Sequence, residues 1–185
     1  MAGGDALGFA EEVVTVALDF RLADATDAGA VAGIRNAAAD ALTAQHGIGH
    51  WSSQCSERGV IRAMQHGQVL LAHDGAVSVG TLCLSRKKPW AIDRDLFRPA
   101  RSPRYLIDMA VLPDRQRRGI GRACLGEAAR LARDAGADAL WLDAYDAPAG
   151  AGEFYRRAGF LEVGRRCYRG VPLVYFELPL GDREG

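Results

Sequence analysis

A single segment near the middle of the chain constrains the fold more than any other. Residues 105–112 are almost entirely apolar, which predicts a buried strand, and Pro113 ends it. A loop follows in which Gly119 and Gly121 stand among arginines, and residues 120–135 carry apolar side chains at helical spacing. Gly136 is suited to end this helix. A buried strand that leads through a glycine-rich loop into a helix is typical of α/β domains.

The sequence on either side of this segment continues the alternation of strands and helices. Alternating or apolar runs predict further strands at residues 13–22, 69–73, 77–85, 139–145, 161–168 and 173–178. Helical spacing predicts helices at residues 27–43, 53–64 and 152–158, the first capped by Thr26 or Asp27 and the second by Ser52 or Ser53. Asp74-Gly75 predicts a hairpin. The order β-α-α-β-β-β-α-β-α-β-β predicts a single mixed α/β domain.

Composition excludes several classes of protein. The 185 residues, 49% hydrophobic and 25% charged, are enough for one globular domain with its own core. The 23 basic and 23 acidic residues cancel, so no net charge attracts nucleic acid or an anionic membrane. No apolar stretch approaches the roughly 18–20 residues of a membrane span, and the N-terminus lacks a signal-peptide pattern. We expect a cytoplasmic domain at residues 13–180, with flexible tails at 1–12 and 181–185.

The cysteines and histidines do not predict a metal site or a disulfide framework. The four cysteines are at least 28 residues apart and form no CxxC pair. His46 and His50 are four residues apart, but Gly47 and Gly49 between them disfavour the helix that would bring both side chains to one metal. We therefore expect neither a structural nor a catalytic metal.

The loop after residue 112 has the composition of an anion-binding site. Glycines allow the backbone to approach a ligand closely, and the first turn of a helix offers unpaired N–H groups. Arg117, Arg118 and Arg122 add forked donors suited to phosphate. The segment lacks the Gly-Lys pair of a P-loop, and Cys124 occupies the third glycine position of a dinucleotide-binding motif. The alternative is a tight turn with solvated arginines.

Two motifs carry a resemblance to a known family. Gln116-x-x-Gly119-x-Gly121, placed after an apolar strand, resembles the acetyl-CoA motif of the GNAT superfamily of acyl-CoA N-acyltransferases. About 30 residues later, residues 154–160 (FYRRAGF) resemble the FYxxxGF segment of the same superfamily. The order of predicted elements also matches, so the resemblance covers roughly residues 13–180.

The resemblance implies both a fold and a cofactor site. The fold is a mixed central sheet of about seven strands, with a V-shaped splay between the fourth and fifth strands, flanked by about four helices. Pantetheine is expected between the strands at 105–112 and 139–145, and the pyrophosphate on backbone N–H groups of the loop. The implied residues for binding acetyl-CoA are Met109, Ala110, Val111, Gln116, Arg117, Arg118, Gly119, Ile120, Gly121, Arg122, Phe154 and Tyr155.

The resemblance also implies a proton donor but leaves the base open. Tyr155 corresponds to the family's tyrosine beside the cofactor sulfur, and the alternative is a core aromatic paired with Phe154. Asp108 is the carboxylate on the strand where many members carry a glutamate. Strand alternation predicts that Tyr105, Ile107, Met109 and Val111 share one face and that Asp108 points to the other, where it could be structural. The other candidate bases are Asp143, Asp146 and His50, or no dedicated base is needed.

The acceptor side is expected to hold His50, Trp51 and Tyr168, with Trp51 alternatively a hydrophobic staple for the following helix. Since these three include no carboxylate, we expect a small, partly apolar or aromatic amine rather than a polyamine or aminoglycoside. Residues 86–104 hold seven basic residues against two acidic ones. A solvated loop is favoured there, with a packed corner at residues 87–90. The alternatives are a guide for an anionic acceptor and a contact to the cofactor's 3′-phosphate from another subunit.

The sequence thus predicts an N-acetyltransferase that moves acetyl from acetyl-CoA directly to a primary amine, as a monomer or homodimer, without metal. The acceptor, the acyl length and the oligomeric state stay open. A catalytically silent acyl-CoA-binding module, a protein N-terminal or lysine acetyltransferase, and a protein that serves only assembly are the alternatives.

Overall fold

The computed structural model describes residues 17–181, so the predicted N-terminal tail and the start of the predicted first strand lie outside the described residues. The strands are β1 (Asp19–Leu22), β2 (Gly67–Asp74), β3 (Val77–Ser85), β4 (Pro103–Val111), β5 (Ala139–Tyr145), β6 (Leu161–Tyr168) and β7 (Val171–Pro179). The helices are α1 (Ala28–His46), α2 (Glu57–Met64), α3 (Ile120–Asp134) and α4 (Gly152–Arg157). Their order along the chain is the one that the sequence predicts.

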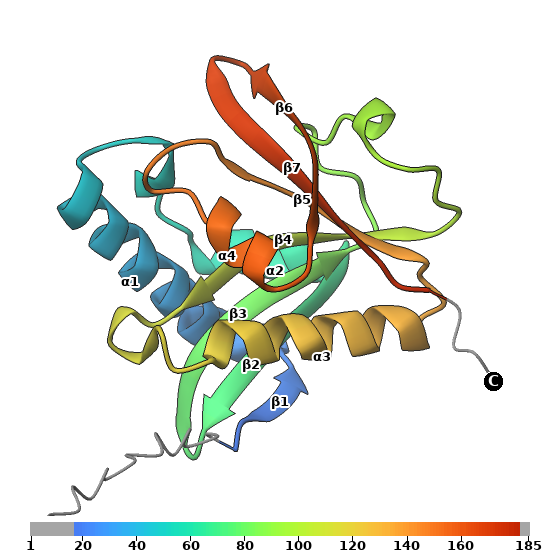
Figure 1. Cartoon of the computed structure of the whole chain (residues 1–185). Coiled ribbons are helices and arrows are strands. Elements are labelled where there is room, and N and C mark those ends of the chain that lie inside the picture. The colour runs from blue at the N-terminus through green and yellow to red at the C-terminus, as the bar shows by residue number, and fades with distance from the viewer. Residues whose placement is uncertain (1–16, 182–185) are drawn as a thin grey trace, which may run out of the picture.

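The seven strands form one mixed sheet with helices on both faces (Figure 1). The strand order is β1-β2-β3-β4-β5-β7-β6, and only β4 and β5 run parallel to each other. Helix α3 connects β4 to β5 and packs on one face, while α1 and α2 pack on the opposite face of β2, β3 and β4. The predicted α/β class is confirmed.

Strands β4 and β5 separate after a short paired stretch. Pairing runs from Pro103 opposite Ala139 to Tyr105 opposite Trp141, and it goes no further within residues 17–181. Strand β5 instead pairs along its whole length with β7. The predicted V-shaped splay between the fourth and fifth strands is therefore confirmed, and it leaves the carboxyl-terminal half of β4 with a neighbour on one side only.

A β-bulge in β4 overturns the predicted alternation of side chains. Asp108 and Met109 together stand opposite a single residue of β3, and Asp108 has a left-handed φ of 58°. An extra residue in one strand reverses the direction of every side chain beyond it. As a result Ile107 packs toward α1 and α2, whereas Met109 and Val111 pack toward α3. The expectation that all four odd-numbered residues share one face is wrong.

The ends of two helices differ from those predicted. Helix α1 continues beyond Thr43 to His46, where Gly47 with a φ of 79° ends it. Helix α2 starts later than predicted, because the hydroxyl of Ser56 rather than that of Ser52 or Ser53 accepts the backbone N–H of Gly59, at 3.2 Å. A separate short 3-10 turn at His50–Ser52 lies in the connection between α1 and α2.

The core consists of three clusters of buried side chains. One lies between the sheet and α3, and a second lies between the sheet and the pair α1 and α2. The third lies beneath the irregular segment at residues 86–104, where Ile92 and Phe97 pack on Trp141 of β5 and Tyr175 of β7. The first and third clusters each contain residues of both β4 and β5, so apolar packing supports the splay from both faces of the sheet.

Candidate active site

A cavity of about 530 Å³ lies between β4, the first turn of α3 and α4. It is lined by every residue expected to bind the cofactor except Arg118 and Ile120. The side chain of Ile120 is 2% exposed and belongs to the core under α3, so only its backbone can face a ligand. We call this space the donor cavity.

The loop at the mouth of the donor cavity presents backbone donors. Gly119 precedes α3 with a φ of 81°, and Arg117 has a φ of 62°. No side chain of the described residues caps the first turn of α3, so its N–H groups remain available to an anion. The side-chain amide of Gln116 donates to the carbonyl of Val111 at 3.1 Å and ties the loop to β4. The predicted anion site is thus fixed in position by the strand before it.

Gly121 allows three elements to meet at the donor cavity. A Cβ at this position would lie 3.1 Å from the ring of Phe154 on α4 and 3.5 Å from Cε of Met109 on β4. Distances near 3.1 Å are tighter than side chains normally tolerate. The glycine therefore allows Phe154 of α4 to pack closely on the first turn of α3, in addition to the close approach of a ligand that the sequence predicts.

Tyr155 lies where the donor cavity meets a second cavity. Its ring packs in the core against Phe154, Phe160 and Phe176, with centroids 5.2–5.7 Å away. Its hydroxyl contacts only the sulfur of Met109, at 3.9 Å, among the described residues. Burial, and then the charge of Asp143, raises the pKa of Tyr155, so the hydroxyl keeps its proton near neutral pH. The ring is therefore a core aromatic, and Tyr155 also lines both cavities.

The second cavity, of about 600 Å³, adjoins the donor cavity along shared lining residues. The two spaces share Leu42, Met109, Ala149, Ala151 and Tyr155. The second cavity extends between β4, β5 and residues 89–91, and it is lined by both Asp108 and Asp143 as well as by Tyr168. We call it the acceptor cavity.

Three carboxylates considered as bases differ in their partners. Asp108 forms an ion pair with Arg35 of α1 at 2.7 Å, which fits the predicted structural role. The guanidinium of Arg165 donates hydrogen bonds to both carboxylate oxygens of Asp146, at 2.8 and 2.9 Å. Asp143 has no side-chain partner within residues 17–181, and burial raises its pKa. Of these three carboxylates, only Asp143 has no ion pair among the described residues.

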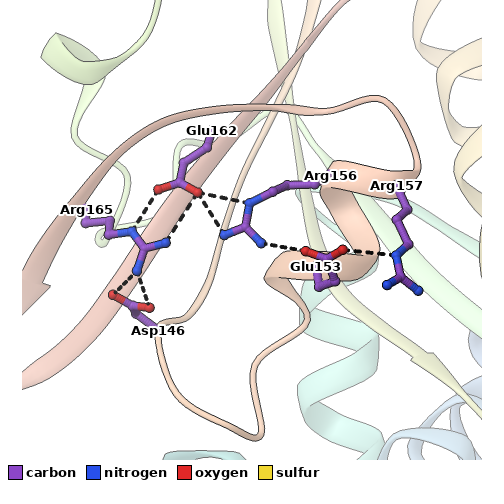
Figure 2. A network of polar contacts seen from close by, with 6 residues as sticks. All are labelled: Asp146, Glu153, Arg156, Arg157, Glu162 and Arg165. Atoms are coloured by element: carbon purple, nitrogen blue, oxygen red, sulfur yellow. Dashed lines mark hydrogen bonds and ion pairs between the residues drawn. The ribbon is translucent and has the colours of Figure 1, made fainter.

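Asp146 belongs to a chain of six charged side chains on the outer surface of α4 (Figure 2). Arg165 links Asp146 to Glu162 of β6, and Arg156 links Glu162 to Glu153, which also binds Arg157. Single exposed ion pairs contribute little to stability, but a connected network in fixed geometry contributes more. This network joins the loop after β5, α4 and β6, and so helps to hold the helix that carries Tyr155.

His50 and Trp51 line a third space of about 290 Å³ that does not include Tyr168. The ring of Tyr145, at the end of β5, lies 6.3 Å from that of His50 and 6.1 Å from that of Trp51, and its hydroxyl donates to the carbonyl of His50 at 3.1 Å. Trp51 is not a staple for α2, which begins only at Glu57; its indole N–H bonds the carbonyl of Gly47. Tyr145 lines both this space and the acceptor cavity. It therefore links His50 and Trp51, which line the first, to Tyr168, which lines the second.

Sequence reasoning missed Tyr145 and misjudged Trp90. Tyr145 is two residues beyond Asp143, so strand alternation places both on one face, which is the signal that could have found it. Trp90 was expected in a packed corner, but it is 82% exposed at the entrance of the acceptor cavity. A residue in an irregular segment gives no periodic signal from which its exposure could be predicted.

The described residues offer no metal centre and no membrane span. No three His, Cys, Asp or Glu side chains within residues 17–181 are grouped to hold a metal ion. None of the helices in this range combines the length and the apolar character that crossing a bilayer requires.

Comparison with known proteins identifies the family. Residues 33–160, more than half of the chain, match the model of the acetyltransferase (GNAT) family. The chain therefore belongs to the GNAT family and is an acyltransferase. No curated protein matches the sequence.

Solved structures with low sequence identity share the fold. YncA from Salmonella typhimurium, solved with its cofactor acetyl-CoA, has a TM-score of 0.65 and 19% identity, over 91% of this chain and 97% of that one. The ribosomal-protein-S18-alanine N-acetyltransferase from Escherichia coli has a TM-score of 0.66 and 19% identity, over 90% and 97%. The PaiA N-acetyltransferase from Thermoplasma acidophilum in complex with coenzyme A has a TM-score of 0.66 and 14% identity, over 88% and 98%.

Proposed function

We propose that this protein transfers an acetyl group from acetyl-CoA directly to a primary amine of a small molecule. Family membership supports the acyl transfer, and the acetyl-CoA and coenzyme A bound to two relatives support the donor. We further propose a cytoplasmic enzyme, a monomer or homodimer, whose domain covers residues 13–180 and whose chemistry involves no metal. The observation that carries the proposal is that Tyr155 lines both cavities.

The donor cavity fits the chemical groups of acetyl-CoA. The uncapped first turn of α3 and the side chains of Arg117 and Arg122 suit the pyrophosphate. The apolar surface formed by Met109 and Phe154 suits the pantetheine chain. Beyond Tyr105, β4 has no partner strand on the side from which β5 has separated, and its backbone groups there suit the pantetheine amides.

Asp143 is our proposed base. A primary amine is protonated at neutral pH and must lose a proton before its nitrogen can attack the thioester carbonyl. The carboxylate of Asp143 lines the acceptor cavity without an ion pair in the described chain, and its raised pKa makes it a better proton acceptor than an exposed aspartate. Asp108 is instead a positioning residue in this proposal, because Arg35 already holds its carboxylate.

Tyr155 is our proposed proton donor. When the nitrogen–carbon bond forms and the carbon–sulfur bond breaks, the departing thiolate needs a proton. The hydroxyl of Tyr155 is protonated and has only a weak acceptor in the sulfur of Met109, so it can donate to a better one. The ammonium nitrogen loses two protons in all, one to Asp143 before the attack and one after the nitrogen–carbon bond has formed. One of these balances the proton that the sulfur gains from Tyr155, the other is released to solvent, and exchange with solvent restores both side chains.

The test is thiol release from acetyl-CoA across a panel of amines, with peptides that begin with alanine included. Tyr155→Phe should lower kcat by about 10²- to 10⁴-fold with little change in coenzyme A affinity, as expected for loss of general acid catalysis. Tyr105→Phe is the matched control, since it removes a hydroxyl from a buried tyrosine that lines neither cavity. Tight binding of acetyl-CoA without turnover of any amine would favour a silent binding module instead.

A further inference from the structure

A basic pocket of about 280 Å³ adjoins the acceptor cavity on the side away from Asp143. We call it the rim pocket. It lies between the end of α2 and the end of β3, and it shares Pro89, Trp90 and Ile107 with the acceptor cavity. Three cations line it, together with one histidine, and no carboxylate does: Arg62, His66, Lys87 and Lys88. A ligand could therefore extend from the acceptor cavity into a strongly basic space.

The positive charge of the rim pocket is not neutralised by the described chain. Within residues 17–181, neither Arg62 nor Lys87 forms an ion pair or a side-chain hydrogen bond. The ammonium of Lys88 binds the carbonyl oxygens of Pro89 and Ile92, at 3.1 and 2.8 Å, which leaves its full charge in place. By contrast, other arginines of the segment at 86–104 are engaged elsewhere, such as Arg98 with Glu177 at 2.7 Å. The rim pocket therefore keeps the positive charge of Arg62, Lys87 and Lys88.

The frame of the rim pocket is fixed by hydrogen bonds. The buried hydroxyl of Ser85 donates to the carbonyl of Lys87 and accepts its N–H, at 2.9 and 3.0 Å. The N–H of Arg86 donates to the carbonyl of His66 at 3.0 Å, which joins β3 to the end of α2. The hydroxyl of Tyr175 holds the carbonyl of Ala91 at 2.9 Å. The spacing between the rim pocket and the acceptor cavity is therefore set by the fold.

Trp90 stands between the two spaces. It lines both, and it is 82% exposed, which is unusual for the largest apolar side chain. An aromatic surface between an acidic and a basic region offers contact area to an apolar spacer. Along this path the charges change from the carboxylate of Asp143 to the cations of the rim pocket.

We propose that the acceptor is a primary amine that carries an anionic group, a carboxylate or a phosphate, at the far end of a short apolar spacer. The amine lies near Asp143, the spacer crosses Trp90, and the anion binds Arg62 and Lys87 in the rim pocket. This inference rests on the proposed function and names its substrate class. It also predicts that a polycation is a poor acceptor, because its second charge would meet the basic pocket.

The experiment compares ω-amino carboxylates of increasing length with the matching ω-amino carboxamides, which have the same shape without the charge. A third series of ω-aminoalkyl phosphates identifies the preferred anion. For at least one length, we expect kcat/KM of the acid to exceed that of the amide roughly tenfold, as for a lost charged hydrogen bond. The preference should shrink between about 0.1 M and 1 M salt, where the screening length falls from about 10 Å to about 3 Å.

Variants assign the preference to the pocket. Arg62→Gln and Lys87→Gln should each raise KM for the acid toward that of the amide, without changing kcat or KM for the amide. Arg58→Gln is the control, since it removes the same charge one turn earlier on α2, outside the rim pocket. It should leave the preference unchanged.

The possible failures are distinguishable. Equal turnover of acids and amides at every length overturns the anion site and leaves the proposed function intact. Binding of acetyl-CoA without turnover of any amine overturns the proposed function and this inference with it. If Arg62→Gln and Lys87→Gln weaken binding of coenzyme A but not of dephospho-coenzyme A, the pocket binds the cofactor's 3′-phosphate from another subunit, and the inference is wrong.

Discussion

The donor and acceptor cavities meet at Tyr155, but they are built in different ways. The donor cavity is formed mainly by two continuous stretches, residues 109–122 and 149–155, and it offers backbone N–H groups and glycines. The acceptor cavity is formed by side chains from α1, residues 89–91, β4, β5, the loop before α4, and β6. Backbone groups from adjacent segments suit a ligand that a whole family shares. Side chains from many separate segments suit a ligand that is particular to one protein. Substitutions should therefore act differently on the two sides.

The largest expected effect is at Asp143, which lines the acceptor cavity and not the donor cavity. Asp143→Asn should lower kcat by about 10²- to 10⁴-fold and remove the fall in activity at acidic pH that protonation of the carboxylate causes. Binding of coenzyme A should not change. The measurement is the pH profile of kcat/KM for both proteins, and an unchanged acidic limb in the variant would assign that limb to another group.

The same variant should be at least as stable as the wild type at neutral pH. Burial raises the folded-state pKa of Asp143 above its unfolded value, so the folded state binds the proton more tightly. This contribution favours folding below the unfolded pKa and is lost as the pH rises through the folded pKa. An amide avoids the cost of ionisation at pH 7. Thermal unfolding at pH 7 tests this, and a clear loss of stability would mean that the carboxylate has a structural partner.

The next effect is confined to the donor side. Gly121→Val should destabilise the fold by about 1–3 kcal/mol through its contact with Phe154, and it should weaken coenzyme A binding. Gly126→Val is the matched control on the same helix, because a Cβ there meets no atom within 4 Å. Chemical denaturation and calorimetric titration with coenzyme A measure both quantities. Equal behaviour of the two variants would exclude close packing at Gly121 as the cause.

A smaller effect is expected at the bulge between the cavities. Arg35→Leu removes the partner of Asp108 and should cost about 1 kcal/mol, because both side chains are partly exposed. If the pair holds the bulge in position, kcat should also fall, and Arg35→Lys should restore part of it. A loss of stability with unchanged kcat would limit the pair to folding.

The smallest effect is expected beside the acceptor cavity, at Trp51, which lines the third space and contacts Tyr145 of the acceptor cavity. Trp51→Ala should raise the acceptor KM several-fold without changing kcat or the affinity for coenzyme A, as loss of uniform binding does. The side chain packs on Tyr145 but is held by its own loop, so the change should stay local. An altered coenzyme A affinity would contradict the separation of the two cavities.

The sequence predicts the donor side more completely than the acceptor side for a physical reason. Strand, loop and helix are adjacent along the chain at residues 105–135, so the local pattern of apolar residues and glycines already describes the site. The bulge at Asp108 is different, because it arises from the register between β4 and β3, which local alternation does not contain. Trp90 and Tyr145 likewise meet their cavity only through packing between distant segments.

The start of α2 shows a similar limit on a smaller scale. Ser52, Ser53 and Ser56 can all cap a helix, and only the path of the chain after His50 decides that Ser56 does so. The order of the elements and the splay were predictable because they depend on long patterns and on a family resemblance. Whether Asp108, Asp143 and Asp146 form ion pairs could not be predicted, because the sequence does not show which charged side chains the fold brings next to an aspartate.

The cluster beneath residues 86–104 has a consequence for how this protein could acquire new acceptors. Phe97 stacks on Trp141 with ring centroids 4.4 Å apart and anchors the segment. Residues 89 and 90 take no part in that stack. Mutations at Pro89 and Trp90 can therefore accumulate with little cost to folding. This part of the cavity wall can therefore vary while the packed segment that carries it keeps its place, and libraries limited to residues 89 and 90 are a direct way to redirect the enzyme toward new acceptors.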